Sequence, residues 1–147
     1  MGIPALPFSR QEATIPKPLS AKFIQNPQTL GEKIRNRRLE LSLLQKDVAP
    51  LLGTNENSIY RWETNKNEPE MKYMPKIIEF LGYFPFEFDS STVGGKIKKY
   101  RYLHGLSQEH LANLLGIDES TVFHFERDKH KPKKGTLLKL KALSIIS

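Results

Sequence analysis

The chain contains an internal repeat with an offset of 63 residues. When residues 29–69 are aligned with residues 92–132 without a gap, fifteen of the 41 positions are identical. Unrelated segments of this length would share roughly two or three residues by chance. One folding unit therefore occurs twice in the chain. The identical pairs are Thr29/Thr92, Gly31/Gly94, Lys33/Lys96, Ile34/Ile97, Arg38/Arg101, Leu43/Leu106, Gln45/Gln108, Ala49/Ala112, Leu51/Leu114, Leu52/Leu115, Gly53/Gly116, Glu56/Glu119, Glu63/Glu126, Lys66/Lys129 and Pro69/Pro132.

A proline-rich arm precedes the first copy. Residues 1–28 contain five prolines and little hydrophobic periodicity, which predicts an extended and at least partly disordered segment. A second break lies near residues 84–91, where Pro85 and the run Asp89-Ser90-Ser91 interrupt the helical pattern. These breaks predict a flexible arm at 1–28, a first domain at 29–88, a linker at 89–91 and a second domain at 92–147.

The apolar spacing inside each copy predicts helices. Thr29 followed by Glu32 fits a capping box at the start of a first helix. Second helices are expected at residues 45–52 and 108–115, and fourth helices at about 74–81 and 135–144. Third helices should follow the capping residues Asn55 and Asp118. The second helices are expected to bury Val48, Leu51 and Leu52 in the first copy and Leu111, Leu114 and Leu115 in the second, and the third helices Ile59 and Trp62 or Val122 and Phe125.

The second and third helices of each copy show helix-turn-helix spacing. Counted from a glutamine, an alanine stands four residues later, a glycine eight residues later and a β-branched residue fourteen residues later. The small alanine lets two helices approach, the glycine allows the tight turn, and the β-branched residue packs the second helix on the first. The pattern occurs as Gln45, Ala49, Gly53 and Ile59 and again as Gln108, Ala112, Gly116 and Val122.

On these residues the chain resembles the phage-repressor/Cro-type family, also called the XRE-like helix-turn-helix family. The segments Leu-Ser-Gln-Glu-His-Leu-Ala-Asn-Leu-Leu-Gly (106–116) and Gly-Glu-Lys-Ile-Arg-Asn-Arg-Arg (31–38) are very similar to its motifs. The resemblance covers roughly residues 29–88 and 92–144. It implies an all-α fold of two tandem bundles of four to five helices, each with its third helix in the DNA major groove. It also implies structural ion pairs, Arg38 with Glu63 and Arg101 with Glu126.

The exposed side of each third helix is the expected base-reading surface. Arginine can donate two hydrogen bonds to guanine and asparagine can pair with adenine. A glutamate in the first turn also suits the helix dipole without touching a base. An exposed aromatic side chain can pack on a neighbouring domain instead of a thymine methyl group. The expected base-reading residues are Glu56, Asn57, Tyr60, Arg61, Glu119, Ser120, Phe123 and His124.

A second set of residues is expected to contact phosphates. Gln45 and Gln108 open the second helices, where backbone N–H groups and an amide can hold a phosphate, although each could also be an ordinary surface glutamine. The lysines after the third helices form either phosphate contacts or a solvated basic loop. These lysines are Lys66, Lys129 and Lys131, followed by Lys133 and Lys134.

The first copy departs from the family pattern at two positions. Leu44 stands where the second copy has Ser107, and Pro50 lies inside the second helix, where it removes one backbone hydrogen bond. The aromatic stretch formed by Phe80, Tyr83, Phe84, Phe86 and Phe88 is expected to pack in a core or between domains, with a dimer interface as the alternative.

Charge favours a polyanionic partner. The chain has a net charge of +7, to which residues 1–28 contribute +2, residues 29–91 contribute −1 and residues 92–147 contribute +6. The alternative is that the excess of basic residues serves only to keep the chain soluble. No apolar run reaches transmembrane length and the N-terminus does not fit a signal peptide, so no membrane partner and a cytoplasmic (bacterial) location are expected.

Several function classes find no support in the sequence. Cysteine is absent, the four histidines lack metal-ligand spacing and no phosphate-cradling glycine loop occurs, so no enzyme activity, metal or cofactor is expected. No small-molecule effector is expected either. We predict a sequence-specific regulator that binds double-stranded DNA, and the family resemblance favours a repressor. The alternatives are an antitoxin-like or assembly subunit with a protein partner and a nonspecific DNA-coating protein. Whether the chain forms a homodimer stays open.

Overall fold

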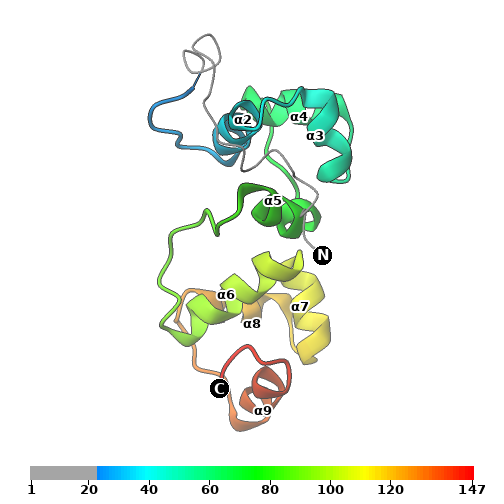
Figure 1. Cartoon of the computed structure of the whole chain (residues 1–147). Helices are drawn as coiled ribbons and strands as arrows, with labels where there is room; N and C mark the ends of the chain where they lie inside the picture. Colours follow the sequence, from blue (N-terminus) through cyan, green and yellow to red (C-terminus); the bar gives the residue numbers. More distant parts are fainter. Residues whose placement is uncertain (1–22) are drawn as a thin grey trace. The chain divides into compact units, whose positions relative to one another are not determined.

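The computed structural model describes residues 23–147, which fold into helices without a strand among them (Figure 1). The chain divides into two compact units, the first ending at Pro85 and the second running from Phe86 to Ser147. The first unit contains α2 (Leu30–Glu40), α3 (Gln45–Leu51), α4 (Glu56–Glu63), the short 3-10 helix η2 (Met71–Tyr73) and α5 (Met74–Leu81). The second contains α6 (Val93–His104), α7 (Gln108–Leu115), α8 (Glu119–Glu126) and α9 (Lys134–Ala142). The prediction of two all-α repeats is therefore confirmed.

Local sequence signals set the helix starts. The predicted capping box is present, since the Thr29 hydroxyl accepts from the backbone N–H of Glu32 at 3.1 Å while the Glu32 carboxylate accepts from Thr29. Asn55 caps α4 by accepting from the N–H of Ser58 at 2.9 Å. Asp118 stands at the same place before α8 but its side chain makes no capping hydrogen bond, contrary to the prediction.

Each unit has its own apolar core built from the inner faces of its helices. Burying one large aliphatic side chain contributes roughly 1.5–3 kcal/mol, so each cluster is a substantial stabilising term before conformational entropy is subtracted. The fully buried side chains of the first unit are Ile34, Val48, Leu52, Ile59, Ile77 and Phe80. Those of the second are Ile97, Leu111, Leu115, Val122 and Leu140.

One core prediction is wrong. Leu114, placed on the buried side of the second helix by its spacing, is 55% exposed. The small Ala112 is buried in that helix, so the core contacts Leu111, Ala112 and Leu115 and leaves Leu114 outside. The fourth helix of the second unit also begins at Lys134 and ends at Ala142, slightly before the predicted bounds.

Two equivalent glycines bring the first helix of each unit against the third. A Cβ atom on Gly31 would overlap the carbonyl oxygen of Trp62, and one on Gly94 would overlap the carbonyl oxygen of Phe125. Only a residue without a side chain permits this approach. The first helix therefore touches the backbone at the end of the third helix in both units.

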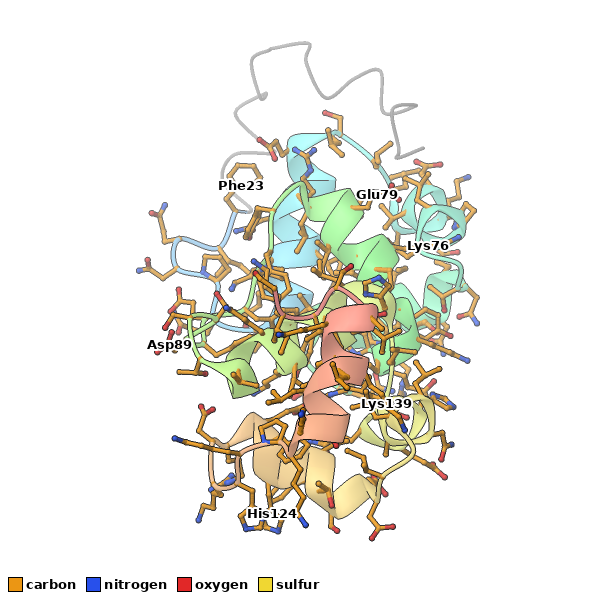
Figure 2. The ribbon with its side chains drawn as sticks, turned by 90° about the horizontal axis from the view of Figure 1, so that it is seen from below. Phe23, Lys76, Glu79, Asp89, His124 and Lys139 are labelled. Atoms are coloured by element: carbon orange, nitrogen blue, oxygen red, sulfur yellow. The ribbon has the colours of Figure 1, made fainter. Side chains whose placement is uncertain are left out.

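The end of the predicted arm is attached to the first unit. The side-chain amide of Asn36 in α2 donates to the carbonyl of Ile24 at 2.9 Å and accepts from its N–H at 3.0 Å. Phe23 and Pro27 line a hollow beside α2, where Figure 2 labels Phe23. Residues 1–22, on which the rest of the flexible-arm prediction falls, lie outside the described residues.

The aromatic stretch is shared between the two units. Phe80 is fully buried in the first core, whereas Tyr83 is 52% exposed. The ring of Phe86 packs edge-on against Tyr102 of α6, with centroids 4.6 Å apart, and Phe88 lies 6.0 Å from the same ring. Phe86 and Phe88, expected at the end of the first domain, thus pack in the second unit.

Candidate nucleic-acid interface

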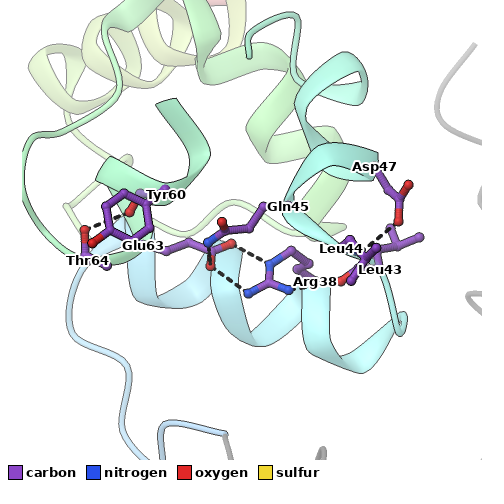
Figure 3. Close-up of polar contacts among 8 residues, drawn as sticks. All are labelled: Arg38, Leu43, Leu44, Gln45, Asp47, Tyr60, Glu63 and Thr64. Carbon is purple, nitrogen blue, oxygen red and sulfur yellow. Dashed lines mark hydrogen bonds and ion pairs between the residues drawn. The ribbon is translucent and has the colours of Figure 1, made fainter. Parts of the chain in front are cut away.

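A buried ion pair ties the first and third helices of the first unit. Arg38 of α2 donates to both carboxylate oxygens of Glu63 in α4, at 2.7 and 2.8 Å, and its third nitrogen donates to the carbonyl of Leu43 (Figure 3). The Glu63 side chain is only 1% exposed. Gln45, the first residue of α3, donates its amide to the same carboxylate at 3.0 Å. Three helices therefore meet at one carboxylate.

The second unit repeats this network at the equivalent positions. Arg101 donates to both oxygens of Glu126, at 2.5 and 2.9 Å, and to the carbonyl of Leu106 at 3.1 Å. Gln108 donates to Glu126 at 3.0 Å. The implied Arg–Glu pairs are confirmed. A planar, bidentate pair with this geometry fixes the orientation of the third helix on the other two.

The outer face of α4 presents the predicted base-reading residues. Glu56, Asn57, Tyr60 and Arg61 are all exposed, Tyr60 to 45%. The inner face buries Ile59 and Trp62. The described contacts engage none of the four outer side chains in a hydrogen bond or ion pair, so their polar groups remain available to a ligand.

The outer face of α8 differs in its last turn. Glu119, Ser120 and Phe123 are exposed, but His124 is half-buried and its Nδ1 is enclosed without a hydrogen-bond partner among the described residues. Its ring lies 4.8 Å from that of His130. His124 is therefore less accessible than Arg61, the residue at the same position of α4.

The predicted phosphate-binding lysines lie in the exposed loops after α4 and α8. Lys66, Lys129 and Lys131 are all exposed. Their surroundings differ between the units. The loop of the second unit also carries Arg127 and Lys133, whereas that of the first carries Glu68 and Glu70.

The starts of α3 and α7 differ as the departure at Leu44 indicated. The Ser107 hydroxyl accepts from the N–H of His110 at 3.0 Å and caps α7. Leu44 has no such group and is 58% exposed, and its own N–H donates to the Asp47 carboxylate at 2.9 Å (Figure 3). The first turn of α3 thus carries Asp47, and the first turn of α7 carries Glu109. Pro50 is accommodated within α3, which ends at Leu51, one position before the equivalent end of α7.

A contact that sequence reasoning missed joins the end of each third helix to the start of the first. Asn65 and Asp128 adopt left-handed backbone conformations, with φ of 58° and 54°. Asn65 donates to Glu32 at 2.9 Å, and Asp128 accepts from the N–H of Gly94 at 3.1 Å. Asn and Asp tolerate positive φ better than other non-glycine residues, so their presence after each third helix could have indicated this left-handed turn.

Hydrogen bonds at the start of α2 perturb one carboxyl group. The backbone N–H of Gln28 lowers the pKa of Glu32 most, and the Asn65 amide and the Thr29 N–H lower it further. In the second unit Gly95 occupies the position of Glu32. The ionised carboxylate of Glu32 therefore helps to stabilise the start of α2 in the first unit.

Two further observations concern residues 23–147. No helix within this range is long and apolar enough to cross a membrane. No group of three or more histidine or acidic side chains in the same range is arranged to hold a metal ion.

Comparison with protein families gives two matches in this chain. A family model described as Helix-turn-helix matches residues 34–88 and again residues 97–141. The two matches together cover more than half of the chain and coincide with the two repeats.

Two curated relatives share parts of the chain. An HTH-type transcriptional regulatory protein of Methanobrevibacter smithii is 29% identical over 113 residues, which cover 76% of this chain and 32% of the relative. An uncharacterised HTH-type transcriptional regulator of Methanocaldococcus jannaschii is 46% identical over 37 residues, which cover 25% of this chain and 56% of the relative. The chain thus matches about a third and about half of these two proteins. No solved structure matches.

Proposed function

The chain belongs to the helix-turn-helix family, and from this membership we propose that it is a transcriptional regulator that binds specific double-stranded DNA with α4 and α8. The observation that carries the proposal is the division of each third helix into two faces. Its inner face is fixed by the core and by the Arg–Glu–Gln network, while its outer face presents side chains able to contact base edges.

Each unit supplies different base-reading chemistry in this proposal. In α4, Arg61 suits a guanine and Asn57 an adenine, whereas α8 offers Ser120 at the place of Asn57. Glu56 and Glu119 stand at equal positions and suit cytosine amino groups. Because the two faces differ, the target consists of two unlike half-sites. In this proposal the chain represses transcription rather than activating it.

Phosphate contacts come from the helix starts and the basic loops. Gln45 and Gln108 each use one amide hydrogen on the buried glutamate, which leaves the second for a phosphate oxygen. Lys129 and Lys131 add positive charge beside α8, and Lys66 beside α4. The second unit therefore supplies most of the sequence-independent affinity, in line with its net charge of +6.

Selection of the full chain against a random DNA duplex pool at physiological salt tests the proposal. Enrichment of two unlike half-sites spaced by a multiple of about 10 bp supports binding by both units of one chain. A palindrome would instead indicate a dimer that uses one unit per half-site. Absence of any enriched sequence would overturn the proposal of a specific regulator.

A second candidate function rests on the first unit. Leu44 and Tyr60 expose apolar surface near α3 and α4, and residues 29–91 carry a net charge of −1. These features fit a protein partner better than a phosphate backbone. Retention of full DNA affinity after Asn57→Ala and Arg61→Ala together would favour this role for the first unit.

A further inference from the structure

The second unit has a cavity beside α8 that is partly apolar and partly basic. Its volume is about 500 Å³, within the range of small-molecule sites. Phe125 and Ile117 provide its apolar lining, and Lys131 and Lys133 with His130 provide its polar edge. This cavity lies inside the helix-turn-helix unit itself, between α8 and α9. From the sequence we expected no small-molecule effector.

The repeat shows why this space is open in the second unit. The 63-residue offset continues through the fourth helices, since Ile77 and Leu140 are both fully buried at equivalent positions. On that offset Tyr73 corresponds to Thr136, which lines the cavity.

In the first unit the corresponding space is occupied. The ring of Tyr73 packs against Trp62, with centroids 5.1 Å apart and planes at 60°. In the second unit Phe125 replaces the larger Trp62, and Thr136 has no ring. The cavity thus follows from two substitutions that each remove aromatic volume from the same place.

The charged residues beside this space also have opposite signs in the two units. Lys131 and Lys133 of the second unit stand where the first unit has Glu68 and Glu70. The described residues that line the cavity include no carboxylate. A neighbouring hollow of about 410 Å³ contains Asp128, whose carboxylate is already bonded to the N–H of Gly94.

We propose that this cavity binds a small organic anion with a flat aromatic body. The aromatic part packs on Phe125 and Ile117 in the space that Tyr73 fills in the first unit. The anionic group lies between Lys131 and Lys133, where a charge-assisted hydrogen bond to each ammonium is available. The hydroxyls of Thr121 and Thr136 offer further polar contacts.

Binding of such an anion competes with DNA. This step rests on the proposed function, in which Lys131 contacts a phosphate. An anion held by Lys131 and Lys133 neutralises the loop that would meet the backbone, so the ligand lowers the affinity for DNA. The site would make the second unit, and not the first, responsive to a metabolite of this class.

Amide NMR of the full chain titrated with naphthoate tests the site without DNA. We expect saturable shifts centred on Ile117, Thr121 and residues 130–136, and weaker binding of the uncharged naphthamide. Each lysine changed to alanine should weaken naphthoate binding about two- to fivefold. Absence of saturable shifts at these residues, or equal binding of naphthamide, would overturn the proposal. If inorganic phosphate bound as tightly as naphthoate, the claim that the cavity selects an aromatic body would be overturned.

Filling the cavity provides the decisive variant. Thr136→Tyr copies the first unit and should abolish naphthoate binding while the protein stays folded, and Thr136→Ser should retain it. Tyr73→Thr is the matched control, because it opens the first unit where Glu68 and Glu70 repel an anion, and it should add no second site. Unchanged naphthoate binding by Thr136→Tyr would contradict the assignment.

The DNA step has its own readout. Naphthoate should weaken DNA binding by the natural chain and leave binding by Thr136→Tyr unchanged. DNA affinity that is unaltered at saturating naphthoate would refute the competition. If the chain binds no DNA at all, the proposed function fails while the NMR titration still decides the ligand site.

Discussion

Gln108 and Arg101 donate to the same carboxylate oxygen of Glu126, at 3.0 and 2.9 Å. The carboxylate is nearly inaccessible, with the Glu126 side chain 5% exposed and Arg101 7% exposed. Gln45 and Arg38 converge in the same way on Glu63. The residue that opens the second helix is thereby held by the residue that closes the third, and the two helices of the motif keep a fixed relation.

The first prediction concerns this buried pair. Glu126→Gln leaves the Arg101 charge buried without its counter-charge and should destabilise the second unit by ~3–5 kcal/mol. Replacing both, Arg101→Met with Glu126→Leu, should lose much less because no charge remains buried. Amide hydrogen exchange in α6 and α8 measures the change. Equal losses for the single and double variants would show that the pair acts through packing alone.

A second prediction follows from the glycine contact between the first and third helices. Gly31→Ala places a Cβ on the carbonyl oxygen of Trp62 and should destabilise the first unit by ~1–3 kcal/mol. Gly135 in α9 of the second unit has nothing within 4 Å of an added Cβ, so Gly135→Ala is the control and should leave amide hydrogen exchange in α9 unchanged or slower. Urea unfolding followed by the fluorescence of Trp62, the single tryptophan, reports the first unit. An unchanged midpoint for Gly31→Ala would contradict the contact.

A third prediction exchanges the capping residues of the second helices. Leu44→Ser supplies the hydroxyl that Ser107 provides in the second unit and should stabilise the first unit by ~1 kcal/mol. Ser107→Leu should destabilise the second unit by a similar amount. Trp62 fluorescence and hydrogen exchange in α7 measure the two effects. A loss of stability in Leu44→Ser would mean that the exposed leucine is covered by a partner in the protein as tested.

The sequence was sufficient for features that depend on local spacing or on the repeat. Helix order and the inner faces of α4 and α8 recur at the same offset, so each copy supported the other, whereas the Arg–Glu pairs were implied by the family resemblance. Leu114 was misplaced because a short helix with leucines at neighbouring positions has no unique buried face until its neighbours are known.

Other features depend on tertiary register and could not be predicted. The bond from Asn65 to Glu32 joins residues 33 positions apart. The cavity beside α8 depends on whether one position carries a ring, as Tyr73, the last residue of η2, does and its equivalent Thr136 in α9 does not. Amphipathic patterns report which face is buried, but not which atoms meet across it.

A fourth prediction separates base contact from phosphate contact. Arg61→Ala should lower the affinity for the selected site by ~1–3 kcal/mol and relax the preference at one base pair. Lys66→Ala should weaken binding to all sequences alike and reduce the slope of log affinity against log salt by about 1. Titrations of selected and scrambled duplexes at several salt concentrations measure both. Equal loss on both duplexes for Arg61→Ala would place Arg61 among the phosphate contacts.

The last prediction concerns acid stability and differs between the two units. Because hydrogen bonds from Gln28, Asn65 and Thr29 lower the pKa of Glu32 in the folded chain, the ionised carboxylate stabilises the first unit above the unfolded pKa. That contribution is lost as pH falls from the unfolded pKa through the folded one. Glu32→Gln should remove this acid-dependent part while leaving Trp62 buried, and the second unit, with Gly95 at the same position, should not respond. Carboxyl-carbon NMR gives the pKa of Glu32, and Trp62 fluorescence against pH gives the stability. A Glu32 pKa at or above its ordinary value would show that the capping box does not hold the ionised form.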